Sequence, residues 1–355
     1  MRNHTGQGRA GQGAGSPERL AAPCTRRQWL HTGGLFLLGG AAAPWLAGCQ
    51  PVPAAPLALG LNAWVGYDPL VLARERGLID TRAVKVIELS SSSETLRHFR
   101  NRLLDAAALT LDEALRLADE GFDPRVVAVL SASAGADVVM ALPEVRNLAG
   151  LRGRTVAVEA TTVGALMLQR LLQAAGLQPD DVKVLNVEAT EHLALLRADR
   201  AQVSVSYEPL AGALREAGLV PIFDSRQMPG DIVDVLLVHA DVLRSRPEQV
   251  QALVAGWHRG LAAVEQDPDA SAALLAPGAD LTPAQYLAAF KGLDFYNAEQ
   301  SLTWLSGQPK ALGQAAEGLA ITLQTMGLIH ESPDWGRLLA PEPAASLLQA
   351  QGARA

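Results

Sequence analysis

The sequence contains few cysteines, few aromatic residues and few lysines. Its only cysteines are Cys24 and Cys49, so the 306 residues beyond position 49 have none. Disulfides, zinc–thiolate sites and thiol nucleophiles are therefore excluded from that part of the chain. Because aromatic residues make up only 5% of the chain, the stretch LNAWVGYDPL (61–70), which holds a tryptophan and a tyrosine beside glycine and proline, requires an explanation.

The N-terminal segment has the parts of an export signal. Arg26 and Arg27 lie in TRRQWL, which resembles the twin-arginine signal, and a glycine- and alanine-rich apolar stretch follows at 33–45. This stretch is shorter than the roughly 20 apolar residues that span a bilayer, so a permanent transmembrane helix is not expected. Such segments are removed and take no part in the fold.

The export segment ends in LAGC, which resembles a bacterial lipobox with Cys49 as the lipidated residue. This predicts that residues 1–48 are removed and that 49–56, which contain PVPAAP, tether the fold to its anchor. A small-residue cleavage site with a chance cysteine is the alternative. We expect a protein of the bacterial cell envelope that is lipid-anchored in the periplasm.

The chain beyond the predicted signal is acidic. Residues 1–48 hold five arginines and one glutamate, so the remainder has 25 basic and 36 acidic residues and a formal charge of about −11. Only four lysines occur. A basic surface for phosphates is not in evidence, which excludes nucleic-acid binding.

From Leu57 onward, short apolar runs alternate with amphipathic segments. One round extends from LALGL to RVVAVLSAS, and a second from TVAVEA to IVDVLLVH. Continuous apolar strands between helices are typical of parallel sheets with helices on both faces. The predicted fold class is therefore α/β with two lobes, and the pattern after about Leu243 indicates a helical C-terminal region.

The two rounds predict a chain that crosses twice between the lobes, near 131–142 and near 224–239. One lobe is then formed by residues 57–140 together with 235–355, and the other by 141–234. In open α/β sheets, ligands bind beyond the carboxyl ends of the strands, where helix N-termini point. The candidate site residues are therefore those that follow the strands.

The stretch at 61–70 is predicted to be the loop between the first strand and a helix that begins near Pro69. Gly66 would let the backbone approach a ligand, and Trp64 and Tyr67 offer flat rings with a polar edge. The alternative is that both rings fill the core beneath the loop.

Hydroxyl and carboxyl side chains follow the next two strands. Ser91 and Ser92 stand at a predicted helix N-terminus, where capping in a flexible loop is the alternative to ligand binding. Thr110 and Glu113 form a T-x-x-E capping box, and capping is the preferred interpretation for Glu113. Thr110 and Asp112 remain open as ligand contacts.

Further candidates lie at the first crossing and at the first strand of the second round. Ser133 and Asp137 are near the crossing, where an outward-facing acid is the alternative for Asp137. Glu159 ends the strand TVAVEA, and Thr161 or Thr162 caps the helix that follows.

The last candidates are Tyr207, Glu208 and Asp234. The first two follow the strand VSVSY, with Pro209 at the first helical position. Asp234 lies inside the otherwise apolar run IVDVLLVH. A buried carboxylate must meet a partner, water or a ligand, and the alternatives are a structural ion pair or an outward-facing bulge.

These motifs occur in the order found in a known family. W-x-G-Y-x-P, LDAAALTLDEAL, SAGAD, LRGRTVAVE, SYEP and PGDIVDVLLV resemble the solute-binding proteins of ABC importers for nitrate, sulfonate, taurine and thiamine precursors, which share their fold with the thiamine-pyrimidine synthases. The resemblance extends from about Leu57 to Leu275. It departs at Ala134, where relatives often carry asparagine.

The resemblance implies a type II periplasmic-binding-protein fold whose two lobes close on a small molecule and deliver it to a membrane permease. It implies a monomer that is not an enzyme, with no cofactor and no metal. Closure of this kind should bring Trp64 and Tyr207 to one groove. Because the candidate positions hold five carboxylates and no lysine, we expect a nitrogen-bearing organic ligand, such as an amine or aminopyrimidine, rather than a sulfonate or nitrate.

Two alternatives from other classes remain. A sensory module would use the same closure to report ligand occupancy to a membrane partner. An enzyme of the thiamine-pyrimidine-synthase type would need a cysteine cluster that is absent here and a lysine at the site, whereas no lysine lies at a predicted strand end.

Overall fold

The computed structural model describes residues 55–145, 147–160, 162–306 and 311–353, which belong to one compact unit. The predictions for the export signal at Arg26 and Arg27, for lipidation at Cys49 and for a cap at Thr161 fall outside these residues. Among the described helices, none is both long and apolar enough to cross a membrane.

The first sheet has six strands in the order β11-β4-β10-β3-β1-β2. Their bounds are β1 Leu57–Asn62, β2 Val84–Leu89, β3 Ala106–Thr110, β4 Pro124–Ser133, β10 Val233–His239 and β11 Leu293–Phe295. β1 pairs in parallel with β2 and β3, whereas β10 runs antiparallel to both β3 and β4. All five residues of β3 are buried, as expected for an apolar strand with both faces covered.

The second sheet has five strands in the order β7-β6-β8-β5-β9. Their bounds are β5 Asp137–Ala141, β6 Thr155–Val158, β7 Lys183–Asn186, β8 Val203–Tyr207 and β9 Val220–Asp224. β6 pairs in parallel with β7 and β8, and β5 runs antiparallel to β8 and β9. The α/β class with two sheets is confirmed, but both sheets are mixed, because each receives a strand from a connection between the sheets.

The chain passes from the first sheet to the second between Ser133 and Asp137 and returns between Asp224 and Val233. Both passages lie inside the predicted crossing segments. Gly135, at φ +120°, breaks the strand at the first passage, so residues 137–140 pair within the second sheet and not within the first lobe to which they were assigned. Likewise, residues 233–234 pair within the first sheet. The division of the whole chain into lobes stays a prediction.

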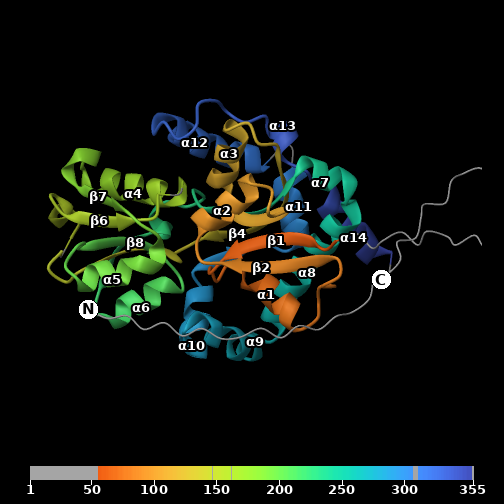
Figure 1. Cartoon of the computed structure of the whole chain (residues 1–355), viewed down its shortest axis with the longest axis horizontal. Helices are drawn as coiled ribbons and strands as arrows, with labels where there is room; N and C mark the ends of the chain where they lie inside the picture. The colour runs from red at the N-terminus through yellow and green to blue at the C-terminus, as the bar shows by residue number, and fades with distance from the viewer. Residues whose placement is uncertain (1–54, 146, 161, 307–310, 354–355) are drawn as a thin grey trace, which may run out of the picture. The chain divides into compact units, whose positions relative to one another are not determined.

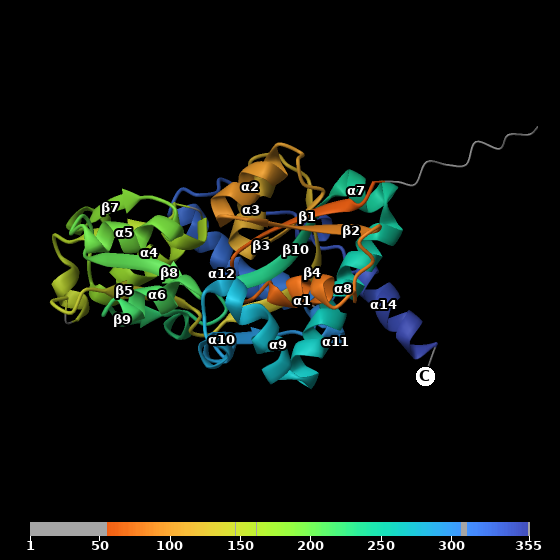
Figure 2. The same ribbon diagram turned by 60° about the horizontal axis from the view of Figure 1, so that its bottom comes forward.

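Helices cover both faces of each sheet. Helices α1 Asp68–Glu75, α2 Ser92–Arg100 and α3 Leu111–Asp119 follow strands of the first sheet, and α4 Thr162–Ala175, α5 His192–Arg197 and α6 Leu210–Glu216 follow strands of the second. The C-terminal helices are α7 Ala240–Ser245, α8 Pro247–Gln266, α9 Pro268–Leu275, α10 Pro283–Phe290, α11 Ala298–Ser306, α12 Ala311–Thr325, α13 Trp335–Leu338 and α14 Glu342–Gly352. In Figures 1 and 2, α2 and α3 lie on one side of β1 and β2, and α1 and α8 lie on the other.

The contact between α1 and α8 depends on a glycine. A Cβ atom at Gly260 of α8 would lie 1.8 Å from the carbonyl oxygen of Pro69 in α1 and 3.2 Å from Cβ of Ala73. The two helices therefore approach more closely than any larger residue allows. Since α1 directly follows the loop that carries Trp64 and Tyr67, this contact positions the loop.

We expect Gly260→Ala to lower the free energy of unfolding by about 2–3 kcal/mol, because the added methyl group must displace the backbone of α1. The matched control is Gly318→Ala in α12, where no atom lies within 4 Å of an added Cβ. In that variant the free energy of unfolding should rise by about 0.5–1 kcal/mol, because alanine favours a helix more than glycine does. Urea unfolding followed by circular dichroism measures both values, and equal effects would contradict the close approach.

Candidate functional site

A small polar cavity lies where strands of both sheets begin or end. Asn62 and Thr110 end β1 and β3, Tyr207 ends β8, and Asp137 and Asp234 stand at the beginnings of β5 and β10. In the antiparallel pairs, Asp137 is opposite Tyr207, and Asp234 is opposite Thr110. The antiparallel strands thus start at the edge where the parallel strands end.

The cavity has a volume of about 30 Å³, which is room for one or two water-sized groups. The residues that line it are Asn62, Trp64, Tyr67, Ser92, Thr110, Asp137, Val163, Tyr207, Ile232 and Asp234. Seven of these are predicted site residues. No lysine or arginine is among the described residues of the lining.

Asp234 is the centre of a hydrogen-bond network that orients this lining. Its carboxylate accepts hydrogen bonds from Nε1 of Trp64 at 2.9 Å, from the hydroxyl of Tyr67 at 3.0 Å and from the hydroxyl of Ser131 at 2.6 Å. A register shift separates Asp234 from Val235. The predicted need for a partner is confirmed, whereas the alternatives of an ion pair or an outward-facing bulge are wrong, because the side chain is fully buried among neutral donors.

Burial raises the pKa of Asp234 to about 6, although its three hydrogen bonds favour the charged form. Burial also raises the pKa of the Tyr67 hydroxyl well above its usual range, with the negative charge of Asp234 acting in the same direction. Near neutral pH, Tyr67 is therefore the proton donor in this pair and Asp234 the charged acceptor.

Two aromatic rings meet across the cavity from different sheets. The ring of Trp64 lies edge-to-face with that of Tyr207, with centroids 5.7 Å apart and planes at 82°. Both rings line the cavity, so they share one site as expected. Gly66 accommodates the tryptophan, because a Cβ atom there would lie 2.2 Å from Nε1 of Trp64.

A second buried carboxylate faces the cavity without full pairing. The backbone N–H of Asp137 donates to the hydroxyl of Ser133 at 3.1 Å, but Oδ2 of Asp137 has no hydrogen-bond partner among the described residues. Burial, together with the nearby carboxylates of Asp234 and Glu113, raises the pKa of Asp137 to about 7. The outward-facing alternative for Asp137 is wrong, because its side chain is only 6% exposed.

Two more polar side chains near the cavity have oxygens without partners in the part of the chain that the structure describes. Oγ1 of Thr110 lines the cavity unpaired, and both carboxylate oxygens of Asp112 are buried and unpaired. Burial, followed by the charge of Glu113, raises the pKa of Asp112 well above its usual range. The hydroxyl of Thr110 and the carboxyl groups of Asp112 and Asp137 therefore leave buried hydrogen-bonding capacity at the site that a ligand could use.

The serines after β2 have separate roles. Ser91 caps α2, because its hydroxyl accepts the N–H of Glu94 at 3.1 Å. The hydroxyl of Ser92 lines the cavity and donates to Oε1 of Glu113 at 2.6 Å. Oε2 of Glu113 accepts the N–H of Thr110 at 3.1 Å, so the glutamate caps α3 as predicted and also orients a cavity residue.

The remaining predicted residues surround the cavity. Ser133 lies at the crossing, where its hydroxyl is 2.8 Å from that of Ser225. Glu159 accepts the backbone N–H of Ser93 at 2.9 Å. Glu208 pairs with Arg215 and lines a different cavity of about 300 Å³ beside α10. Thr162 begins α4, but its side chain is outside the description.

Sequence reasoning missed three residues that line the cavity, namely Asn62, Val163 and Ile232. Ser131, which lies in the predicted crossing segment, donates to Asp234. Asn62 carried a usable signal, because it is the polar residue that ends the first apolar strand. Val163 and Ile232 carried none, since apolar residues beside a strand end are equally typical of the core.

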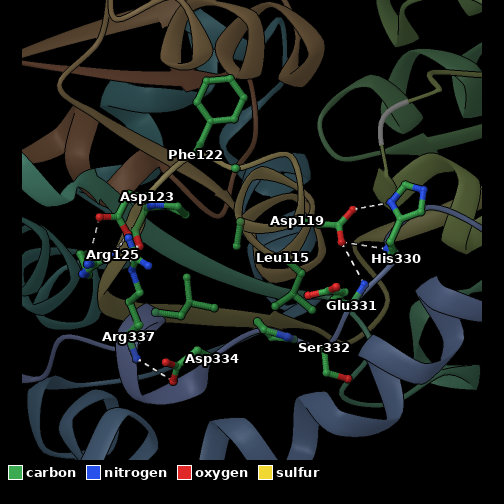
Figure 3. Close-up of a pocket in the computed structure, with 15 residues that line it drawn as sticks. Leu115, Asp119, Phe122, Asp123, Arg125, His330, Glu331, Ser332, Asp334 and Arg337 are labelled. Atoms are coloured by element: carbon green, nitrogen blue, oxygen red, sulfur yellow. Dashed lines mark hydrogen bonds and ion pairs between the residues drawn. The ribbon is translucent and has the colours of Figure 1, made fainter.

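A larger cavity, with a volume of about 530 Å³, lies elsewhere, between the end of α3 and the segment around α13 (Figure 3). Several of its charged side chains pair with one another: Asp119 pairs with His330, and Asp123 with Arg125 and Arg337. No strand of the second sheet contributes to it. Within the described ranges, no group of three or more His, Cys, Asp or Glu side chains could hold a metal ion.

Comparison with known proteins places this geometry in a family. A model of the NMT1-like family matches residues 50–276. A comparison with curated protein sequences gives no match.

Several solved structures have the same fold. The alkanesulfonate-binding protein SsuA from Xanthomonas axonopodis pv. citri, bound to MOPS, is similar with a TM-score of 0.67 and 18% identity over 82% of this chain and 98% of that one. The periplasmic nitrate-binding protein NrtA from Synechocystis PCC 6803 is similar with a TM-score of 0.64 and 14% identity, over 84% of this chain and 90% of that one. The desulfurization enzyme DSZB is similar with a TM-score of 0.61 and 18% identity, over 83% of this chain and 99% of that one. These similarities confirm the predicted two-lobed periplasmic-binding-protein fold.

Tyr67→Phe tests the network around Asp234. Because the variant removes one hydrogen bond to a buried carboxylate, we expect the free energy of unfolding at pH 8 to fall by about 1.5–3 kcal/mol. The cost should be smaller at pH 5, where Asp234 is largely protonated. Tyr296→Phe, at a half-buried ring, is the control and should change stability by less than about 0.5 kcal/mol. Equal costs for the two variants in urea unfolding would refute the network.

Asp137→Asn tests the electrostatics of the cavity. A carboxyl group whose pKa is raised by folding stabilises the protein below its unfolded value of 3.8, and this stabilisation is lost as the pH rises through the folded value of about 7. The stability of the variant relative to the parent should therefore increase by about 2–4 kcal/mol between pH 4 and pH 8. The exposed Asp294→Asn is the control. A pH-independent difference for Asp137→Asn in thermal unfolding would count against a raised pKa.

Proposed function

The chain belongs to the NMT1-like family, and on that premise we propose that it is a solute-binding protein of an ABC importer. In this proposal, the protein captures a small molecule between the two lobes and delivers it to a permease in the membrane. The predicted export signal and Cys49 support lipid anchoring in the periplasm, and the similarity to the alkanesulfonate-binding SsuA and the nitrate-binding NrtA supports the same class of function. We expect the protein to act as a monomer.

One observation carries the proposal: a buried polar cavity whose lining comes from both sheets. Trp64, Tyr67 and Asp234 contribute from the first sheet and its loops, and Asp137 and Tyr207 from the second. A site built in this way is complete only when both lobes are together. A ligand that contacts both faces then stabilises the closed arrangement by its differential affinity.

The size of the cavity supports a requirement for motion. About 30 Å³ is far below the roughly 300 Å³ or more of a typical ligand pocket. An organic ligand can enter only if the lobes separate. The connections at Ser133–Asp137 and Asp224–Val233 are the segments that would absorb this rotation.

The chemistry of the lining favours a ligand rich in hydrogen-bond donors. Asp137 presents an unpaired carboxylate oxygen, Thr110 presents an unpaired hydroxyl, and no described cation lines the cavity. A sulfonate or nitrate would meet carboxylates in place of the donors it needs. An amine or aminopyrimidine would satisfy the acceptors, lower the cost of burying the carboxylates and contact the ring of Trp64 or Tyr207.

An enzymatic alternative is favoured by the similarity to the desulfurization enzyme DSZB, a structure of which contains biphenyl-2-sulfinic acid. That compound is an anion at neutral pH, so the acidic lining disfavours it. Consumption of biphenyl-2-sulfinate by the protein would be direct proof of turnover.

Calorimetric titration with 4-aminopyrimidine, alkylamines, methanesulfonate and nitrate tests the ligand class. We expect a nitrogen-bearing compound to bind, and at 100 times its Kd to raise the free energy of unfolding by about 2.7 kcal/mol. Asp137→Asn should weaken its binding at least tenfold, because the variant removes the facing charge, whereas Asp294→Asn should leave binding unchanged.

Two outcomes would count against the proposed function. Tight binding of methanesulfonate or nitrate alone, unaffected by Asp137→Asn, would contradict the ligand class. Consumption of biphenyl-2-sulfinate without stable binding of any amine would contradict a binding protein and favour an enzyme.

A further inference from the structure

A carboxylate from the second lobe lies against the first turn of α2. Glu159 directly follows β6, and its Oε1 accepts the backbone N–H of Ser93 at 2.9 Å. Its Oε2 lies 3.4 Å from the backbone nitrogen of Ala189, which donates to it. The side chain is only 6% exposed. A buried acidic side chain thus joins a helix end of one lobe to a loop of the other.

Backbone donors, and not cations, balance the charge of Glu159. No described lysine or arginine lies within 4 Å of its carboxylate, so no ion pair neutralises it. The two N–H groups and the positive end of the α2 dipole remain as its counter-charge. A helix N-terminus of this kind also attracts anionic ligands. An anion arriving there would have to displace Glu159.

The cavity adjoins the same helix end. Ser92, the first residue of α2, lines it together with Thr110 and Asp137. Both of the latter are more than nine-tenths buried and present an unpaired oxygen. The hydroxyl of Ser92 is already donated to Glu113. The helix end therefore presents hydrogen-bond acceptors to a ligand. Its backbone donor at Ser93, which could bind an anion, is already paired with Glu159.

The position of Glu159 is built into the turn between β6 and α4. A Cβ atom at Gly164, in the first turn of α4, would lie 2.1 Å from the carbonyl oxygen of Glu159 and 3.0 Å from the side chain of Val158. The absence of a side chain at this position lets the helix start directly against Glu159. The contact with Ser93 is therefore held by the backbone of the second lobe.

We propose that Glu159 is a specificity-determining residue: its carboxylate acts as a built-in anion at the N-terminus of α2, joins the two lobes there, and excludes anionic ligands from the cleft. The statement about ligands rests on the proposed function, because it assumes that the cleft binds a solute. The statement about the joined lobes does not.

Titration with methanesulfonate tests the exclusion of anions. Glu159→Ala should bind methanesulfonate at least tenfold more tightly than the parent chain, because the N–H of Ser93 becomes free. The affinity of Glu159→Gln for methanesulfonate should lie between those of the parent and Glu159→Ala. Its amide oxygen still accepts the N–H of Ser93 but carries no charge. Glu191→Ala, at an exposed glutamate nearby, is the matched control, and its affinity for methanesulfonate should equal that of the parent. No gain in Glu159→Ala, or an equal gain in Glu191→Ala, overturns the proposal.

A distance measurement without any ligand tests the contact between the lobes. Spin labels at Leu103→Cys and Val184→Cys, which are 63% and 52% exposed, report the separation between the turn after α2 and strand β7 in a full chain whose Cys24 and Cys49 are replaced by serine. Glu159→Ala should give longer and broader distances than the parent, and Glu191→Ala should not. Superimposable distributions for Glu159→Ala and the parent overturn the proposal.

The two experiments separate this inference from the proposed function. If no amine or aminopyrimidine binds, the ligand class of the proposed function fails, but the label distances still decide whether Glu159 joins the lobes. A melting curve for each variant checks that it is folded. If Glu159→Ala does not fold, Glu159→Gln replaces it in both experiments.

Discussion

The site depends on one buried carboxylate that has no cation beside it. Asp234 would be too costly to bury alone, and three neutral donors offset this cost. Two of them, Trp64 and Tyr67, come from the loop after β1, and the third, Ser131, comes from β4. Because Asp234 stands on β10, the strand by which the chain returns from the second sheet, the same residue fixes the cavity wall and lies at the connection between the sheets.

Much of this site was predictable because it follows a rule of sheet geometry. Parallel strands of a sheet end at a common edge, so Thr110 and Tyr207 could each be placed at the carboxyl edge of its own sheet from the sequence alone. The need for a partner at Asp234 followed from its apolar surroundings. The identity of that partner did not: Trp64 and Tyr67 are 170 and 167 residues away, and only the order of strands in the finished sheet brings them together.

The errors have a common physical origin. Local patterns do not reveal strand direction, so neither the antiparallel β5 and β10 nor the pairing of residues 137–140 within the second sheet was foreseen. Side-chain direction at a strand end is equally hidden. Gly66 accommodates the indole of Trp64, and Glu208 pairs with Arg215 outside the cavity, although both positions looked suited to a ligand.

The unpaired acceptors link occupancy to closure. When the lobes are together, Oδ2 of Asp137 and Oγ1 of Thr110 are buried without donors, and burial raises the pKa of Asp137. When the lobes separate, water can pair with these atoms, so their cost belongs to the closed arrangement alone. Under the proposed function, a ligand that supplies the missing donors removes a cost that is present in the closed state and absent in the open one, and this difference would allow binding to drive closure.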